Sequence, residues 1–232
     1  MTRLRDSVAS ARPAGGQMRH FVTDRRRFHL SPDDLVARAA HAARAGVDVI
    51  QVRERDLEDA ALLGVVRAIV RATAGTSARV VVNDRADIAI LAGAAGVHLR
   101  GDSPPASRVA AFAASARASA SKAAAGASAG RAPAGFLIGR SVHSLAEIDA
   151  AVADGGCDYL MFGTVFPSAG KPAGHPVAGL DALRAACARS PLPVIAIGGV
   201  DEAGAALVRA AGAAGFAAVG LFMCLTPLPE VV

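Results

Sequence analysis

The stretch Val194-Ile195-Ala196-Ile197-Gly198-Gly199 decides the fold, because it joins a short apolar run to two consecutive glycines. Such a run is typical of a parallel strand that is buried on both faces. A second short run, Ala217-Ala218-Val219-Gly220, follows one helical segment later. In β/α barrels the loops after the seventh and eighth strands expose backbone N–H groups that bind phosphate. We therefore expect Gly198, Gly199, Val219 and Gly220 to hold a phosphate group.

Other short apolar runs alternate with helical patterns along the whole chain, which is typical of βαβ units around a parallel sheet. Helix starts are marked by Ser31-Pro32-Asp33-Asp34, by the capping-box pattern Ser144-Leu145-Ala146-Glu147 and by Asp201-Glu202. Eight such units close into a barrel more readily than they form an open sheet. The sequence therefore predicts a single-domain (β/α)8 TIM barrel. The expected strands are 20–23, 47–53, 80–83, 96–99, 136–141, 159–163, 194–198 and 217–221.

Composition restricts the class of ligand and the location of the protein. The chain has 232 residues, 53% hydrophobic, with a formal net charge of +5, 4% aromatic residues and no Trp. The lack of aromatic residues argues against nucleic-acid binding, so we expect anionic small molecules, namely phosphate substrates. No stretch is long and apolar enough for a membrane span. The three cysteines lack CxxC spacing, which favours a cytoplasmic location and argues against a zinc site.

Three segments depart from the β/α rhythm. Residues 1–18 are expected to be a flexible extension before the barrel domain of residues 19–232. The segment 113–134, rich in Ala and Ser, is expected to be loose after a helix. After the eighth strand, Pro227 and Pro229 block a normal helix, so the last helix should be truncated. Apolar surface left by that truncation makes a homodimer a possible assembly.

Polar residues at strand ends form the candidate active site, because reacting groups in barrels lie at the C-terminal ends of the strands. After the second strand, alternation sends Gln51, Arg53 and Arg55 to one side and Glu54 to the other. Polar side chains there are expensive to bury unless they meet a ligand or one another. The alternative to substrate binding is an internal ion-pair network.

The third strand ends in Asn83-Asp84, and Asp102 follows the fourth strand. Carboxylates at two neighbouring strand ends suit Mg²⁺, which binds one or two carboxylates together with water and substrate phosphate. The alternative is structural, since an Asn-Asp pair also occurs in turns and helix caps.

The fifth strand leads to Ser141 and His143, and the loop after the sixth strand contains Ser168 and Lys171. A loop with a hydroxyl, glycine N–H groups and a cation has the components that hold a diphosphate. His143 is either a general acid or base, or a histidine packed against the top of the barrel.

These motifs, taken in order, resemble the thiamine phosphate synthase and thiazole tautomerase superfamily, over about Phe21 to Leu221. The motifs that carry the resemblance are Val22-Thr23-Asp24-Arg25, Gln51-Val52-Arg53-Glu54, Val82-Asn83-Asp84-Arg85, Gly96-Val97-His98-Leu99, Asp158-Tyr159 with Gly163, Phe166-Pro167 and Ile197-Gly198-Gly199.

The resemblance implies that the chain joins hydroxymethylpyrimidine diphosphate to a thiazole phosphate, with release of pyrophosphate. By position it implies that the pyrophosphate is contacted by Gln51, Arg53, Arg55, Ser168 and Lys171, and that Asn83 contacts the pyrophosphate or the pyrimidine. It also implies that Ser141 faces the reacting methylene, that Asp84 binds Mg²⁺, and that Gly198, Gly199, Val219 and Gly220 hold the thiazole phosphate.

The chain also departs from the synthase pattern. Ser103 stands at the position of the second metal-binding Asp, with Asp102 one position earlier, and Arg55 stands where the family usually has Lys. The loop around Ser168 has fewer hydroxyls than usual, and Arg140-Ser141-Val142-His143-Ser144 is closer to the tautomerase branch. That branch lacks the metal and diphosphate chemistry, and its histidine matching His143 shuttles a proton. A synthase is therefore predicted, with a thiazole tautomerase and a non-catalytic thiamine-phosphate sensor as alternatives.

Overall fold

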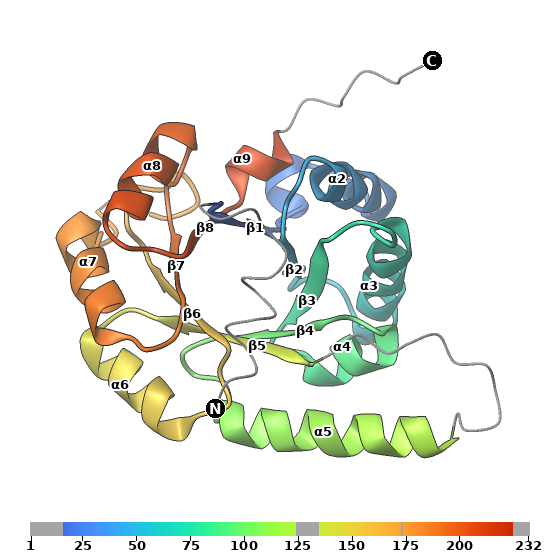
Figure 1. Cartoon of the computed structure of the whole chain (residues 1–232). Coiled ribbons are helices and arrows are strands. Elements are labelled where there is room, and N and C mark those ends of the chain that lie inside the picture. Colours follow the sequence, from blue (N-terminus) through green and yellow to red (C-terminus); the bar gives the residue numbers. More distant parts are fainter. Residues whose placement is uncertain (1–15, 124–134, 173, 225–232) are drawn as a thin grey trace.

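The computed structural model describes residues 16–123, 135–172 and 174–224, and these residues form a closed barrel of eight parallel strands in the order β1 to β8 (Figure 1). The helices surround the barrel, and all but α9, which follows β8, come between two successive strands in the chain. The predicted (β/α)8 barrel is therefore confirmed. Among the described residues, no helix is long and apolar enough to span a membrane.

The strands are β1 (Met18–Val22), β2 (Val49–Val52), β3 (Arg79–Asn83), β4 (Gly96–Leu99), β5 (Leu137–Val142), β6 (Tyr159–Gly163), β7 (Val194–Ile197) and β8 (Gly215–Ala218). The helices are η1 (Arg26–Phe28), α2 (Pro32–Arg44), α3 (Asp59–Ala72), α4 (Ala86–Ala92), α5 (Ala106–Ala123), α6 (Leu145–Asp154), α7 (Gly179–Arg189), α8 (Glu202–Ala210) and α9 (Gly220–Met223).

Alternation along the strands divides the apolar residues into two clusters. The larger cluster packs between the sheet and the surrounding helices, and it includes Phe21, Ile50 and Leu160. The smaller cluster fills the barrel interior. It comprises Val22, Val49, Val81, Leu137, Tyr159, Met161, Ile195 and Ala217. The interior is thus packed with side chains, so a ligand of the barrel itself binds at its mouth.

The end of the chain differs from the sequence prediction. The eighth strand was expected over 217–221, but β8 ends at Ala218 and the backbone turns into α9 at Gly220. Apolar composition cannot separate a four-residue strand from the short apolar helix that follows it, which explains the error. Helix α9 nevertheless covers β1 and β8, because Phe222 is fully buried against Phe21 and Phe216. Pro227 and Pro229 lie outside the described residues.

The Ala-rich region is more regular than expected. Helix α5 continues to Ala123, so residues 113–123 are helical where a loose segment was expected. Ala has the highest helix propensity, and buried Ala113 anchors one face of the helix. Residues 124–134 and 1–15 lie outside the described part of the chain, and β1 already begins at Met18, inside the predicted extension.

The predicted helix starts are observed, with one change that concerns the site. Ser31 and Asp34 form a complete capping box, and Asp201 accepts a hydrogen bond from the Gly204 amide. Ser144 caps α6 by accepting from the Glu147 amide. The Glu147 carboxylate, however, accepts from the backbone N–H of His143, at 2.9 Å. This contact fixes the chain at His143, one residue before the cap.

Candidate active site

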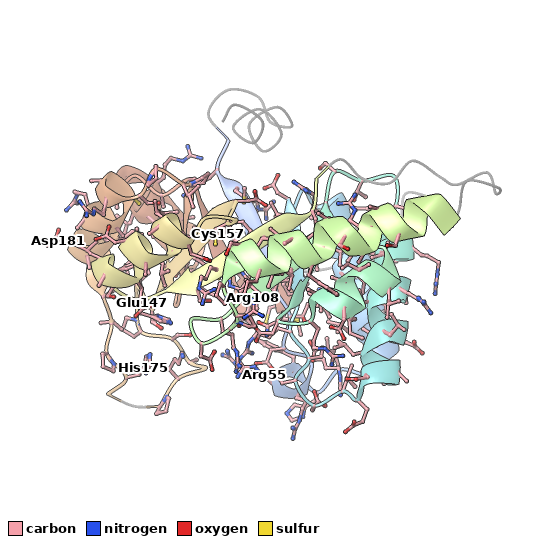
Figure 2. The ribbon with its side chains drawn as sticks, turned by 90° about the horizontal axis from the view of Figure 1, so that it is seen from below. Arg55, Arg108, Glu147, Cys157, His175 and Asp181 are labelled. Atoms are coloured by element: carbon pink, nitrogen blue, oxygen red, sulfur yellow. The ribbon has the colours of Figure 1, made fainter. Side chains whose placement is uncertain are left out.

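A cavity of about 860 Å³ opens at the C-terminal ends of the strands, where the sequence places the site. Arg55 and His175, from loops after β2 and β6, lie at this same end of the molecule in the side view (Figure 2). The predicted residues that line the cavity are Gln51, Arg53, Arg55, Asn83, Asp102, Ser141, His143, Ser168, Lys171, Gly198, Gly199, Val219 and Gly220. Asp84 is not part of the lining.

The Gly198-Gly199 turn forms one wall of the cavity, and both residues have positive φ, at 102° and 63°. A Cβ at Gly198 would lie 2.5 Å from Thr164 Cγ2, and one at Gly199 would lie 2.2 Å from the Pro167 carbonyl oxygen. A side chain at either position would therefore collide with the loop after β6. Glycine is required here so that the loops after β6 and β7 can approach each other.

Helix α9 adds N–H groups beside this turn. The amides of Phe222 and Met223 donate to Val219, and that of Cys224 donates to Gly220. The preceding amides, of Gly220 and Leu221, belong to the first turn of a helix and have no acceptor within it. Val219, Gly220 and Leu221 all line the cavity. This arrangement suits a phosphate group, as predicted from the glycines.

Another part of the lining is cationic. Its positively charged side chains are Arg27, Arg53, Arg55, Arg100 and Lys171. Burial lowers the pKa of Arg53, with repulsion from Arg55 the next cause and attraction by Asp24 opposing it. Arg53 is half-buried, and its nearest carboxylate oxygen, on Asp24, is 4.0 Å away. An anion between these arginines would remove the repulsion and complete their hydrogen bonding.

Glu54 points away from the cavity, as alternation predicts. Its carboxylate accepts hydrogen bonds from Thr23 Oγ1, at 2.6 Å, and from the Arg25 amide. Burial raises the pKa of this carboxyl group, against the effect of those hydrogen bonds. Glu54 thus ties β2 to the loop after β1, and its carboxylate lies 3.8 Å from Arg25 Nε.

Gln51 and Asn83 connect the second and third strands at the floor of the cavity. Gln51 Nε2 donates to Asn83 Oδ1 at 3.0 Å, and Asn83 Nδ2 donates to Asp84 Oδ2 at the same distance. The two amides fix each other's orientation, so Asn83 presents a defined face toward the cavity.

Ser141 is held by a buried chain of hydrogen bonds. Its Oγ lies 2.9 Å from His98 Nε2, and His98 Nδ1 lies 3.0 Å from the Tyr159 hydroxyl. Burial lowers the pKa of His98 to about 3, so the imidazole is neutral near pH 7. A neutral ring donates one hydrogen bond and accepts the other, which orients the Ser141 hydroxyl at the cavity.

His143 is exposed on the cavity wall with one ring nitrogen engaged. Nδ1 lies 2.5 Å from the Gly163 carbonyl oxygen, which can only accept, so Nδ1 carries the proton. In the neutral ring Nε2 is then a free base or hydrogen-bond acceptor. Of the two readings of His143, the geometry favours an acid or base over a packed side chain.

The loop after β6 closes the cavity beside the loop after β1. Ser168 and Lys171 both line the cavity, and the Lys171 amide donates to the Ser168 carbonyl. A Cβ at Gly170 would lie 2.8 Å from Arg27 Nη1, so the guanidinium of Arg27 lies directly against this loop. The pattern of Ser, Gly and Lys did predict this loop, but nothing in the sequence placed Arg27 next to it.

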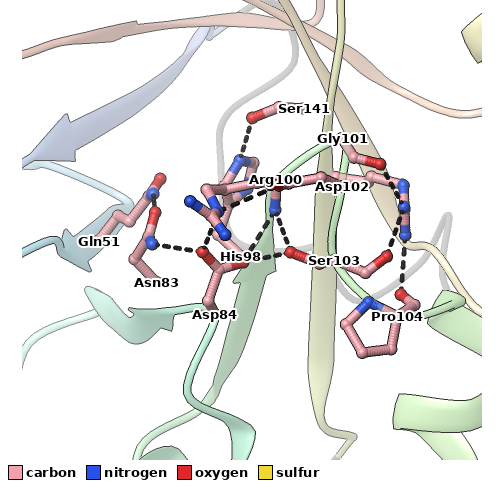
Figure 3. Close-up of polar contacts among 11 residues, drawn as sticks. Gln51, Asn83, Asp84, His98, Arg100, Gly101, Asp102, Ser103, Pro104 and Ser141 are labelled. Carbon is pink, nitrogen blue, oxygen red and sulfur yellow. Dashed lines mark hydrogen bonds and ion pairs between the residues drawn. The ribbon is translucent and has the colours of Figure 1, made fainter.

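The residues expected to bind Mg²⁺ are engaged with the protein itself (Figure 3). Asp84 Oδ1 accepts from the Arg100 amide and from Ser103 Oγ. Asp84 Oδ2 accepts from Asn83 Nδ2 and lies 2.6 Å from Arg100 Nε. Asp102 Oδ1 lies 3.2 Å from the same Nε. The two carboxylates therefore share an arginine.

This donor set does not fit a divalent cation. Within the described residues no group of three or more His, Cys, Asp or Glu side chains could hold a metal ion, so a metal here would depend on the two carboxylates alone. Both Asp84 oxygens already have partners, and a guanidinium lies where the charge of a cation would be. The same contacts leave Asp84 outside the cavity lining, behind Arg100.

The sequence alone assigned no role to Arg100 or His98. A cationic side chain directly after a strand that ends in His98-Leu99 was the available signal for Arg100. For His98 the signal was a polar residue at an inward-facing position of an otherwise apolar strand. Only the barrel geometry shows that Arg100 contacts Asp84 and that His98 contacts Ser141.

The buried histidines make stability depend on pH. His20 and His98 each have a pKa of about 3 in the folded chain, chiefly because of burial, against 6.5 as the ordinary value. The unfolded chain then binds more protons between these values, so stability is complete above pH 6.5 and falls as the pH drops toward 3. Each histidine contributes a slope of at most about 1.4 kcal/mol per pH unit.

We expect His98→Gln to reduce the slope of the unfolding free energy against pH by up to about 1.4 kcal/mol per pH unit, the contribution of one histidine. This holds whatever the stability of the variant at pH 8. Urea unfolding at a series of pH values measures the slope, with His175→Gln, at an exposed position, as the control. An unchanged slope in His98→Gln would show that His98 is not a source of acid sensitivity.

Comparison with known proteins agrees with this geometry. The family model described as thiamine monophosphate synthase matches residues 19–126 and 119–222. Thiamine-phosphate synthases of Anaeromyxobacter dehalogenans and Methanoculleus marisnigri are 37% and 39% identical, over 78% and 77% of this chain and 72% and 75% of theirs. The solved structure of thiamine phosphate pyrophosphorylase from Pyrococcus furiosus is 27% identical, with a TM-score of 0.72 over 91% of this chain and 89% of that one. The chain therefore belongs to the thiamine monophosphate synthase family.

Proposed function

We propose that the chain joins hydroxymethylpyrimidine diphosphate to thiazole phosphate and releases pyrophosphate, forming thiamine phosphate. The observation that carries this proposal is that one cavity has two anion-binding sides. The Gly198-Gly199 turn and the start of α9 form one side, and the arginines with Lys171 form the other. A reaction between two phosphorylated substrates uses both sides, whereas rearrangement of one thiazole phosphate uses one.

In this reaction the chain's residues act by binding, orienting and stabilising charge. The thiazole phosphate is held at the glycine side, and the diphosphate at Arg53, Arg55 and Lys171. As the carbon–oxygen bond to the diphosphate breaks, negative charge grows on the leaving group, and the arginines stabilise it there. Ser141, oriented by His98 at 2.9 Å, contacts the pyrimidine methylene between the two sides.

The accompanying assignments remain predictions. Mg²⁺ was expected from Asp84 and Asp102, but the contacts with Arg100 argue against it, and the mechanism above includes no step through a metal. A cytoplasmic location is supported by three cysteines that form no disulfide, Cys157, Cys187 and Cys224. The chain is proposed to form a homodimer. Its proposed ligands are small-molecule phosphates, and neither nucleic acid nor a membrane is a proposed partner.

A thiazole tautomerase is the second candidate, and His143 is the observation that favours it. With Nδ1 donating to the Gly163 carbonyl, Nε2 is free to accept a proton from a thiazole precursor held at Gly198 and Gly199. Neither this proton transfer nor the binding of one phosphate at Gly198 and Gly199 requires the arginines of the cavity. The synthase is proposed first because its diphosphate substrate does use them.

Purified protein supplied with thiazole phosphate and pyrimidine diphosphate is expected to form thiamine phosphate, detected after conversion to its fluorescent thiochrome. The reaction should be run both with Mg²⁺ and with EDTA. Absence of product, together with accelerated isomerisation of the non-aromatic thiazole precursor, would contradict the synthase and support the tautomerase. If both activities are absent and thiazole phosphate still binds, the result would support a non-catalytic sensor.

A further inference from the structure

We propose that the guanidinium of Arg100 is the resident cation of this site, holding Asp84 and Asp102 in place of a divalent metal and binding the anionic leaving group directly. The inference concerns the site of the proposed function and deepens it. Its test does not require that reaction to occur.

The first support is the geometry of the two carboxylates. Arg100 Nε lies 2.6 Å from Asp84 Oδ2 and 3.2 Å from Asp102 Oδ1, so one nitrogen bridges both side chains. The Arg100 side chain lies beside the Asp84 carboxylate in the close-up (Figure 3). A metal ion would need the same oxygens at about 2.0–2.1 Å, and its charge would repel the guanidinium strongly at that separation.

The second support is the way the backbone fixes Asp84. Asp84 has a φ of 59°, in the left-handed region that Asp adopts more readily than most residues. Its amide donates to the His98 carbonyl, and its Oδ1 accepts from the Arg100 amide. The side chain of Asp84 is thus held against the loop after β4. There its carboxylate contacts Arg100 and does not line the cavity.

The third support is the rigidity of the loop that carries Arg100. Arg140 donates to the carbonyl oxygens of Gly101, Ser103 and Pro104, at 2.8, 2.9 and 3.0 Å. Ser103 Oγ also accepts from the Arg100 amide, at 2.9 Å. The loop is therefore tied to β5 by three hydrogen bonds and to Asp84 by its own serine. Arg100 is held in place before any ligand arrives.

The fourth support is the exposure of the guanidinium to the cavity. Arg100 lines the cavity, and 46% of its side chain is exposed while its Nε contacts the carboxylates. The remaining N–H groups are accessible to a diphosphate, whose oxygens a guanidinium binds in pairs. Arg53 lines the same cavity, so the two arginines can contact one anion there.

Binding of Mn²⁺, followed by its electron paramagnetic resonance signal, tests the metal half of the proposal. The test compares three proteins, each prepared without added metal. They are the wild-type chain, Arg100→Ala, and the double variant Arg100→Ala with Ser103→Asp. Arg189→Ala is the matched control, because it removes the same charge from an ion pair with Asp149 on the outer helices. Wild type and Arg189→Ala should show no stoichiometric binding. Arg100→Ala should bind at least about tenfold more tightly than they do, and the double variant more tightly again.

Two results would overturn the metal half. Stoichiometric Mn²⁺ binding by the wild type would show that the carboxylates accept a metal despite Arg100. Failure of both Arg100 variants to gain affinity would show that Arg100 is not what excludes the cation. A chain without synthase activity can still pass either test, so failure of the proposed function is distinguishable from failure of this inference.

Inorganic pyrophosphate, titrated calorimetrically in EDTA, tests the anion half. The wild type and Arg189→Ala should bind it equally, and Arg100→Ala should bind about tenfold more weakly or worse, since a charge-assisted hydrogen bond is lost. Equal affinity in Arg100→Ala would show that Arg100 does not bind the anion.

Discussion

The Arg53→Ala variant is expected to lose about 10²–10³-fold in kcat/KM for thiamine phosphate formation while remaining as stable as the wild type. Arg53 is half-buried and repelled by Arg55 and Arg100, and its pKa is lowered mainly by burial. In the absence of an anion these costs are opposed by attraction from Asp24, 4.0 Å away, and from Glu54. A growing negative charge on the leaving group gives Arg53 its missing partner, so the residue contributes most in the transition state.

Initial rates and thermal unfolding of the same preparation test this prediction. Arg67→Ala is the control, because Arg67 is exposed and donates to the Leu91 carbonyl on the outer helices. It should retain the wild-type rate. If Arg53→Ala kept its activity but unfolded at a clearly lower temperature, Arg53 would be a structural residue, and the ion-pair alternative would be correct.

The sequence was sufficient for the fold because barrel strands have a simple pattern. Short apolar runs separated by helix caps such as Ser31 and Asp201 locate the β/α units, and the structure has all eight. The period of two along a strand also placed Glu54 opposite Arg53 and Arg55. These features are local, so they could be derived without knowing which strands are neighbours.

The contacts of the two carboxylates could not be predicted from local sequence. Asp84 and Asp102 do lie at neighbouring strand ends, as expected, but the residue between them in space is Arg100. The direction of the Asp84 side chain depends on a positive φ, and the position of Arg100 depends on contacts of its loop with Arg140. Neither the backbone angle nor the loop conformation can be obtained from residue types and spacing.

The hydrogen bond that orients Ser141 could not be predicted from the sequence for a different reason. Its contact with His98 joins residues 43 positions apart, and that of His98 with Tyr159 joins residues 61 positions apart. These side chains meet inside the barrel only because β4, β5 and β6 are adjacent in a particular register. The role of Ser141 therefore came from resemblance, and its orientation came from the structure.

His143→Asn is expected to slow isomerisation of the non-aromatic thiazole precursor by about 10²–10⁴-fold, the contribution of a positioned acid or base. The amide of Asn can still donate to the Gly163 carbonyl, which now accepts from Nδ1 at 2.5 Å. It has no group that can take a proton near pH 7, so the variant separates the packing role of His143 from its chemistry. Binding of thiazole phosphate at Gly198 and Gly199 should be unchanged.

The rate of aromatisation, followed by NMR, and the Kd for thiazole phosphate give the two readouts. His175→Asn is the matched control, since His175 is an exposed histidine near the same end of the barrel. Formation of thiamine phosphate from the aromatic thiazole should survive in His143→Asn, because that reaction does not need the proton shuttle. An unchanged isomerisation rate would exclude His143 as the base. Loss of both reactions, with Kd intact, would instead make His143 part of a step that synthase and tautomerase chemistry share.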